Sequence, residues 1–534
     1  MLSCSNSLNR HVIAILEKCS SLNHLKQLQS HLITLGHGNT HLYTFKLIRF
    51  CTIRLRDLTY ARHLFDKFPS PNIYLYTAII SAQASVSDHQ SSLLLYRDMI
   101  RKNRSKPNHF MFSIILKSLP EVVKRYGVEM VQAQIVKLGY GGNMVVQTAI
   151  LDAYCRYGVE IGYARKVFDE MSDRNVVSWT AMISGYAKAG RMGNAVLLFE
   201  EMPESIRDAP FWNCIISGCV QNGLFSEAVD FFTRMVVEGK NKPNQGTIVC
   251  ALSALGHGGM LRVGKCIHGY IYRNGFDSDL FIASGLIDMY GKCGALQKSR
   301  IVFDNCVDRN LTSWNCMINC YALHGRCVEA IAIFEDMLRH HGDQMAPDGV
   351  TFVGLLSACN HGGLVTEGRY YYEMMIEKYK IEPEIEHYGC LVDLLGRSGR
   401  FEEAMDVVNG MRVLPDEAVW GSLLNGCKIH RRVDLAEFAV KKLMEINRDN
   451  GAYRSILANL YGEMGMWDEA GRIRKTLSEG NVGKAAGCSW IEVDDRVHNF
   501  KSVDKSHPMT EEIYGVLECL ADTYKTQYDY CVMT

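Results

Sequence analysis

The chain has 534 residues, a formal net charge of +0 and 47% hydrophobic residues. This length exceeds what one ordinary hydrophobic core supports, so it predicts several domains or a stacked repeat. The neutral charge argues against wrapping duplex DNA by charge alone. No apolar stretch is long enough to span a bilayer. From the charge and from this absence, we expect neither DNA nor a membrane as a partner.

The N-terminal segment, residues 1–40, is predicted to hold a candidate transit peptide and a partial repeat. Several Ser and Asn residues and Arg10 precede Glu17, which is the first acidic residue. A Ser-rich start without acids is compatible with a transit peptide, although this one is poor in Arg.

A Trp-centred block recurs along the chain. Residues 178–186 read SWTAMISGY, residues 211–219 read FWNCIISGC, and residues 313–321 read SWNCMINCY. Trp179 and Trp212 are 33 residues apart, and the next matching Trp follows 102 residues later. A period of this size predicts a solenoid of stacked units rather than a compact enzyme.

One unit, residues 176–208, has the pattern of two helices. Apolar residues over 179–186 recur at i, i+3, i+4 and i+7, which predicts the first helix. Gly190 suits a helix C-cap, a second apolar stripe covers 195–202, and Pro203 ends it. Each unit is therefore predicted to be a helix-turn-helix hairpin too small to bury its own apolar faces.

The same plan predicts an all-α fold, a right-handed α-solenoid of about ten hairpins over residues 41–416. A glycine recurs at the turn and a phenylalanine in the second helix. These residues are Gly190, Gly223, Gly294, Gly325 and Gly399, with Phe168, Phe199, Phe232, Phe303 and Phe334.

Near the C-terminus, residues 489–501 read as a small β-hairpin. Apolar residues on both sides flank Asp494 and Asp495, which mark a turn. This is the one strand-like segment that the sequence predicts.

Metal, cofactor and catalytic sites are not expected. The sequence has no C-x-x-C and no H-x-E followed by paired Cys, the patterns typical of zinc and redox sites. Cys250, Cys293, Cys359 and Cys427 lie among small residues of the repeats, so we expect free, buried thiols.

The blocks resemble the pentatricopeptide repeat family, in particular its plant subclass with repeats of alternating length. Residues 176–180 and 311–315 open repeats, residues 285–294 resemble the short type, and residues 351–359 resemble the long type. The resemblance covers nearly the whole chain. It implies a solenoid that reads one base of single-stranded RNA per repeat with two or three side chains.

The C-terminal region also resembles this family. Residues 386–397 look like the last short repeat, 419–424 open an E1 motif, and 458–461 lie in an E2 motif. On this basis residues 417–486 are assigned to the E1 and E2 motifs. Residues 487–534 are assigned to a truncated extension of the E-plus type.

In the family, that extension leads into a cytidine deaminase-like domain. Here Ala486 stands where the motif usually has Pro, the chain stops soon after Tyr530, and the metal-binding His, Glu and Cys of the deaminase are missing. We therefore expect no enzymatic activity from this chain.

Two residues per hairpin could read a base. One, the helix residue, falls just off the apolar stripe of the first helix; the other, the terminal residue, is the last of the hairpin. A terminal Asp accepts a hydrogen bond and suits guanine or uracil, whereas a terminal Asn can donate and suits adenine or cytosine. In the family, Thr or Ser at the helix position goes with purines and Asn with pyrimidines.

The pairs give a predicted base order. They are Thr77 with Asn108 (adenine), Ser113 with Asn143 (weakly adenine-like), Thr148 with Asn175 (adenine), Thr180 with Asp208 (guanine), Asn213 with Asn244 (cytosine, or uracil less well), Ser284 with Asn310 (adenine) and Asn315 with Asp348 (uracil). Val249 with Asp279 and Val353 with Glu384 lack this chemistry. Val177 and Leu311 are candidates for packing against a base.

The leading hypothesis is a plant organellar protein that binds single-stranded RNA and selects sites for C-to-U editing, with the deaminase supplied in trans. A splicing or RNA-stabilising factor is one alternative, and a protein-binding scaffold of the tetratricopeptide type is another. The family favours a mitochondrial location, with the chloroplast as the alternative.

Overall fold

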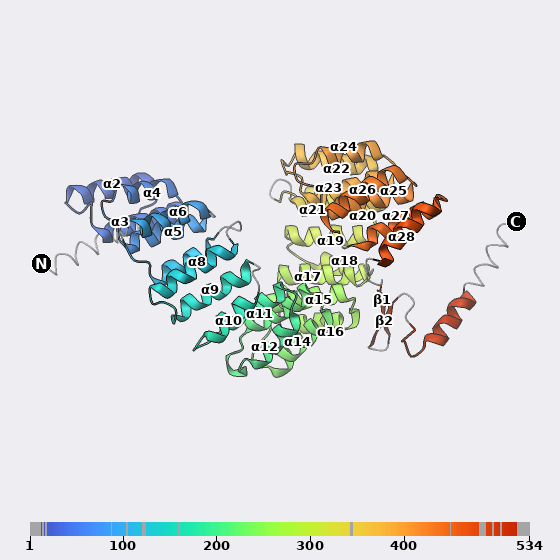
Figure 1. The fold of residues 1–534 in the computed structure, drawn as a ribbon, viewed down its shortest axis with the longest axis horizontal. Coiled ribbons are helices and arrows are strands. Elements are labelled where there is room, and N and C mark those ends of the chain that lie inside the picture. The colour runs from blue at the N-terminus through green and yellow to red at the C-terminus, as the bar shows by residue number, and fades with distance from the viewer. Residues whose placement is uncertain are drawn as a thin grey trace. The chain divides into compact units, whose positions relative to one another are not determined.

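The computed structural model describes residues 12, 15–16, 19–86, 88–102, 105–119, 124–157, 161–341, 345–448, 450–479, 488–493, 496–501 and 505–520. The chain divides into two compact units, Met1–Cys250 and Ala251–Thr534. Each is built mainly from helical hairpins (Figure 1). The predicted transit peptide lies almost entirely outside the described residues.

The first unit consists of helices joined by short loops. In chain order they are α2 (Leu22–Thr34), α3 (His41–Phe50), the π-helix η1 (Cys51–Leu55), α4 (Leu58–Asp66), α5 (Ile73–Ser85), α6 (His89–Arg101), α7 (His109–Lys117), α8 (Lys124–Lys137), α9 (Met144–Arg156), α10 (Ile161–Glu170), α11 (Val176–Lys188), α12 (Met192–Glu201), the 3-10 helix η3 (Glu204–Ile206), α13 (Ala209–Gln221) and α14 (Phe225–Glu238).

Helix α15 (Gln245–Gly258) spans the division between the units. The second unit continues with α16 (Leu261–Arg273), α17 (Leu280–Lys292), α18 (Leu296–Asn305), α19 (Leu311–Leu323), α20 (Cys327–His341), α21 (Gly349–Gly362), α22 (Val365–Glu377), α23 (Ile385–Arg397), α24 (Phe401–Asn409), α25 (Glu417–Ile429), α26 (Val433–Ile446), α27 (Gly451–Glu463), α28 (Trp467–Glu479), β1 (Cys488–Val493) and β2 (Arg496–Lys501).

Local signals in the sequence set the ends of these helices. At the start of α11, the Asn175 side chain accepts a hydrogen bond from the Ser178 N–H at 2.9 Å, which satisfies one of the free backbone donors there. The five predicted turn glycines all have positive φ, from +65° to +77°. The predicted hairpin turns are therefore confirmed.

The core of each hairpin is aromatic. All five predicted phenylalanines are buried, and Phe168 packs edge-on against Trp179 with ring centroids 5.0 Å apart and planes at 79°. Phe303 and Trp314 repeat this arrangement at 5.0 Å and 78°. A side chain of the second helix thus packs on the first helix of the next hairpin, so no hairpin is buried alone.

First helices also stack on first helices. In the first unit α11 packs between α9 and α13, and in the second unit α19 packs between α17 and α21. This arrangement aligns equivalent residues of successive first helices along one face, which is where the candidate site lies.

The stacking continues beyond residue 416. Helices α25 and α26 form one hairpin, α27 and α28 form another, and α25 packs against α23. One hydrophobic cluster runs from Tyr388 to Ala470 across these helices. The region assigned to the E1 and E2 motifs therefore shares its core with the last repeats.

After α28, strands β1 and β2 pair antiparallel, with Ile491 opposite His498. Asp494 and Asp495, the predicted turn, lie outside the described residues. Residues 510–520 then form a further helix. None of the helices in the described part of the chain combines the length and the hydropathy needed to cross a membrane.

The close approach of α25 to α23 predicts unequal effects for two glycines of one helix. A Cβ atom at Gly426 would lie 2.7 Å from the Gly396 carbonyl carbon, whereas one at Gly421 would have no atom within 4 Å. We expect Gly426→Ala to lower the free energy of unfolding by about 1–3 kcal/mol, because backbone atoms cannot yield easily. Gly421→Ala should leave it unchanged or raise it by up to about 1 kcal/mol. Chemical denaturation followed by circular dichroism measures both, and equal midpoints would contradict the packing.

Candidate functional site

The predicted pairs occupy equivalent positions in the fold. Every helix residue is the fifth residue of a first helix; these are Thr77 in α5, Ser113 in α7, Thr148 in α9, Thr180 in α11, Asn213 in α13, Ser284 in α17 and Asn315 in α19. Every terminal residue stands directly before the next first helix; these are Asn108, Asn143, Asn175, Asp208, Asn244, Asn310 and Asp348. The terminal residues are thus also helix N-caps.

Two of the pairs are joined by a direct hydrogen bond. Asn213 Nδ2 donates to Asn244 Oδ1 at 3.1 Å, and Asn315 Nδ2 donates to Asp348 Oδ1 at 3.0 Å. In a third pair the Ser284 hydroxyl donates to the Leu280 carbonyl oxygen of its own helix at 2.8 Å, and its Oγ lies 3.5 Å from Asn310 Oδ1. Side chains that are 26 to 33 residues apart in the chain therefore lie together, and of these Ser284 and Asn315 are buried.

In the other four pairs the helix hydroxyl bonds within its own helix. The hydroxyls of Thr77, Thr148 and Thr180 donate to the carbonyl oxygen four residues earlier at 2.7–2.8 Å, and that of Ser113 does so at 3.2 Å. Since the single hydroxyl proton is used in this way, the oxygen faces outward as an acceptor.

Sequence reasoning missed a third polar residue at this site. Thr351, the third residue of α21, donates to Asn315 Oδ1 at 2.7 Å and accepts from the Asp348 N–H at 3.1 Å. Thr247 makes the corresponding contacts with Asn213 and Asn244 at 2.5 and 3.1 Å. Both threonines are buried, so their hydroxyls hold the side chains of the pair from the interior of the solenoid. The sequence does contain a signal for these threonines, because Asp or Asn followed three residues later by Thr can form a capping box.

Ser313 has a related role in α19. Its hydroxyl lies 2.9 Å from Asn310 Oδ1 and 2.9 Å from Ser284 Oγ. The hydroxyl group of the third helix residue therefore links the two members of the Ser284–Asn310 pair.

An exposed apolar residue stands beside each of several pairs, at the second position of the first helix. Tyr74, Phe110, Val145, Val177, Phe281 and Val350 have this position and are 47–64% exposed. Val177 is one of the two candidates that the sequence suggested. Leu311, the other, is the first residue of α19 and is partly buried. Large apolar side chains are therefore exposed at one fixed position in several hairpins.

Cations follow the same face further along the first helices. The fifth, ninth and thirteenth residues of a helix share one face, and the thirteenth is Arg or Lys in α9, α11, α17 and α23: Arg156, Lys188, Lys292 and Arg397. Asp288 bridges to Lys292 at 2.8 Å and Asp393 to Arg397 at 3.0 Å. Each of these two cations is thus held in place by an acidic residue of its own helix.

Of the four cysteines that the sequence singled out, Cys359 and Cys427 are buried, and Cys250 and Cys293 are partly buried. Burial raises the pKa of the Cys359 and Cys427 thiols to about 12, so neither is a thiolate at neutral pH. Among the described residues, no group of His, Cys, Asp and Glu is arranged to hold a metal ion.

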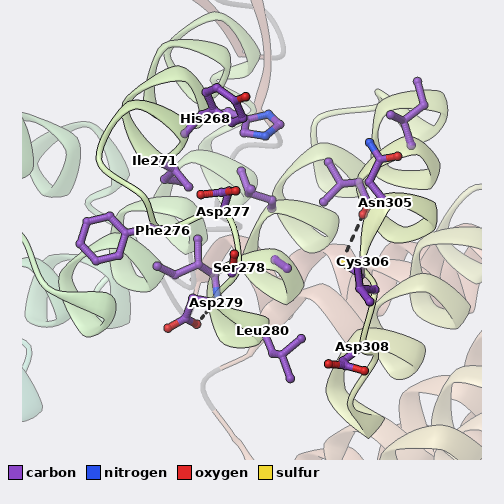
Figure 2. Close-up of a pocket in the computed structure, with 17 residues that line it drawn as sticks. His268, Ile271, Phe276, Asp277, Ser278, Asp279, Leu280, Asn305, Cys306 and Asp308 are labelled. Carbon is purple, nitrogen blue, oxygen red and sulfur yellow. Dashed lines mark hydrogen bonds between the residues drawn. The ribbon is translucent and has the colours of Figure 1, made fainter.

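A cavity of about 550 Å³ lies beside α17 (Figure 2). Asp277, Ser278 and Asp279 lie in the loop that leads into α17, and Asn305 and Cys306 stand across the cavity (Figure 2). The cause is in the sequence: the fourth residue of α17 is Ala283, whereas α11, α13 and α19 have Trp there. The small side chain of Ala283 thus lines the cavity at the position where those hairpins have an indole ring.

Helical hairpins that each present one polar pair on a common face define a helical-repeat binding protein, with a surface that extends from hairpin to hairpin. The chain belongs to the pentatricopeptide repeat family, as the sequence resemblance indicated. The PPR repeat matches residues 177–205, 211–239, 312–341 and 386–414, and the pentatricopeptide repeat domain matches residues 70–120. The E motif matches residues 430–492, in agreement with the predicted E-type subclass.

Relatives in Arabidopsis thaliana extend over nearly the whole chain. Pentatricopeptide repeat-containing protein At1g33350 is 51% identical over 515 residues, which are 96% of this chain and 95% of the relative. Pentatricopeptide repeat-containing protein CRR2, chloroplastic, is 36% identical over 536 residues, 98% of this chain and 75% of the relative. The structure of PPR10 from maize has a TM-score of 0.55 at 15% identity, over 88% of this chain and 74% of that one, which is a likeness of fold.

The contacts of Thr351 predict that its hydroxyl is required for the Asn315–Asp348 pair. Thr351→Val keeps the shape but leaves the Asn315 oxygen and the Asp348 N–H without this partner, at a cost of about 1–3 kcal/mol in local stability. Thr351→Ser keeps the hydroxyl and is the matched control. Hydrogen exchange of residues 348–352 should accelerate in the Val variant alone; equal exchange in both variants would contradict the contact.

Proposed function

We propose that this protein binds single-stranded RNA in a sequence-specific manner within a plant organelle. The observation that carries the proposal is the row of paired polar side chains at the fifth helix residue and the following N-cap. The adjacent row of exposed apolar residues supports it, because bases stack on such side chains whatever their sequence. The Arg and Lys residues at the thirteenth position of several first helices support it as well, since cations offset phosphate charge.

The hydrogen bonds within a pair leave a defined edge for a base. In the Asn315–Asp348 pair, Asp348 Oδ1 accepts from Asn315, so the second carboxylate oxygen and the second amide hydrogen of Asn315 are the groups that this bond leaves for a base. One acceptor beside one donor complements the N–H and carbonyl oxygen of uracil. In the Asn213–Asn244 pair, the remaining groups are amide donors, which complement the ring nitrogen and carbonyl oxygen of cytosine.

The related proteins are consistent with this role. PPR10 of maize has been solved in complex with an 18-nt psaJ RNA element. Two of the Arabidopsis relatives are named chloroplastic and chloroplastic/mitochondrial, which supports an organellar location for this chain. The choice between mitochondrion and chloroplast is a matter for localisation experiments with a fluorescent fusion.

We further propose that the bound RNA is a C-to-U editing site and that a cytidine deaminase is recruited in trans. The match to the E motif supports this, because in the family this region leads toward the deaminase. The helix at 510–520 offers a surface for a partner, since Val516, Leu517 and Leu520 are exposed. Apolar side chains that recur at i, i+3, i+4 make a helix face of the kind that docks into a groove.

The first test is the base preference of one hairpin. The protein should bind RNA with the order A-x-A-G-(C/U)-x-A-U, running 5′ to 3′ with the chain. Thr180→Asn should weaken binding to this RNA by roughly 1–3 kcal/mol and shift the preference toward a pyrimidine at the guanine alone. Thr233→Asn is the control, because Thr233 also bonds to the carbonyl four residues earlier but lies in α14, a second helix. Equal binding of all RNA sequences in a gel-shift series would refute base reading.

The second test concerns the partner. Because α25 packs on α23, a cut after Asp416 would expose the core, so surface variants are preferable. Leu517→Glu with Leu520→Glu should abolish editing in a complemented knockout plant while RNA affinity stays unchanged. The control is Glu518→Gln on the same helix. Wild-type editing by the double Glu variant would exclude this helix as the docking surface.

A further inference from the structure

The residue directly before a terminal residue is anchored in the core of many hairpins. In four of them it is a buried proline, whose fixed φ restricts the chain that leads into the N-cap. These are Pro71, Pro107, Pro243 and Pro347, which precede Asn72, Asn108, Asn244 and Asp348.

In three other hairpins the same position is an arginine. Arg309, before Asn310, donates from Nε to the Phe303 carbonyl oxygen at 3.0 Å and from Nη2 to the Asp304 carbonyl oxygen at 3.2 Å. Its guanidinium lies 4.5 Å from the Phe303 ring and 5.5 Å from the Trp314 ring. It therefore closes the C-terminal end of α18 and stacks on the aromatic pair that joins two hairpins.

The arrangement repeats in the first unit. Arg174 donates to the Phe168 and Asp169 carbonyl oxygens at 3.1 and 3.3 Å, with its guanidinium 4.6 Å from the Phe168 ring. Arg207 is 6% exposed, donates to the Phe199 and Met202 carbonyl oxygens at 3.2 and 2.9 Å, and lies 4.8 Å from the Phe199 ring.

Several junctions have neither residue; among them Asn39 precedes Thr40, Gly142 precedes Asn143, and Ser278 precedes Asp279. At these three N-caps ψ is 119°, 116° and 118°. After a proline or an arginine, ψ is 175° at Asn108, 170° at Asn175, 173° at Asp208, 168° at Asn310 and −177° at Asp348. Because ψ sets the direction of the following helix relative to the side chain, the terminal residue is aimed differently in the two groups.

Capping contacts differ in the same way. Asn143 and Asp279 each accept from the N–H groups of both the second and third residues of the next helix. Asn175 and Asn310 each accept from the third residue only, at 2.9 and 2.8 Å. Asp416, which follows Pro415, also accepts from both the second and third N–H groups, so the number of capped donors does not follow the anchor at every junction.

The cavity beside α17 is an independent sign of the missing anchor. Ser278 and Ala283, which stand where other hairpins have the arginine and the tryptophan, both line it.

We propose that Arg174, Arg207 and Arg309 are positioning residues for the terminal residues that follow them. Each holds its N-cap near ψ 170° by a stacked, carbonyl-bonded guanidinium, and so does the work of the buried proline in neighbouring hairpins. The effect on base reading rests on the proposed function; the effect on the geometry of the N-cap does not.

The test uses Arg309 in the full chain. Arg309→Ala should reduce discrimination at the base facing the Ser284–Asn310 pair by roughly tenfold, with no change at the base facing Asn315–Asp348. Arg309→Pro should restore the wild-type preference, because proline supplies an anchor without a charge. A purely structural or phosphate-binding arginine would not be rescued by proline. Loss of discrimination at both bases, or failure of Arg309→Pro to restore it, overturns the proposal.

Hydrogen exchange separates this inference from the RNA proposal. The Ser313 N–H, which Asn310 caps, should exchange faster in Arg309→Ala than in wild type or Arg309→Pro without any RNA present. Ser278→Pro, which adds an anchor, should instead expose the Phe281 N–H that Asp279 now binds. Unchanged exchange in these variants overturns the inference even if RNA binding is specific. If exchange follows expectation while all RNAs bind equally, the proposed function fails and the positioning stands.

Discussion

A helix begins with backbone N–H groups that have no partner in the helix, and in most first helices of this protein an Asn or Asp side chain accepts from one or two of them. The same residue is the last one of the preceding hairpin. The capping residues therefore recur once per repeat and also belong to the candidate site. In the Asn315–Asp348 pair, one carboxylate caps α21 through Oδ1 and accepts from Asn315 through the same oxygen. A change at such a residue therefore affects the helix start and the candidate site together.

The stacking of first helices makes a surface from these caps. Because α19 packs between α17 and α21, the fifth residue of each helix comes to lie beside the cap of the next. Buried hydroxyl groups, such as that of Thr351, donate to the side chain of a pair and so restrict its rotation. A repeated, rigid polar pair beside an exposed apolar side chain is suited to a linear ligand with a repeating unit, such as a single strand of nucleic acid.

The hairpins are not equivalent, and their differences have physical causes. Where Pro or Arg precedes the cap, the loop is anchored. Where Gly or Ser precedes it, the ψ angle of the capping residue is smaller, 116° and 118° instead of 168° at Asn310. At α17 the absence of both the arginine and the tryptophan leaves a cavity. The residue before the cap thus alters the backbone geometry of the cap, even where the cap itself is Asn or Asp in both groups of hairpins.

The sequence by itself determined the hairpins, their turns and the positions of the paired residues, because these depend on local periodicity, on Gly at positive φ and on a fixed repeat length. It identified Thr180 and Asp208 as equivalent to Asn315 and Asp348 on that basis alone. Only the tertiary structure decided which pairs are hydrogen-bonded, since Asn213 and Asn315 donate to their partners, whereas the hydroxyls of Thr180 and Ser284 donate within their own helices. The roles of Thr351 and Arg309 also required it, because a buried hydroxyl between two hairpins and a guanidinium on two rings are contacts between helices, which sequence spacing does not encode.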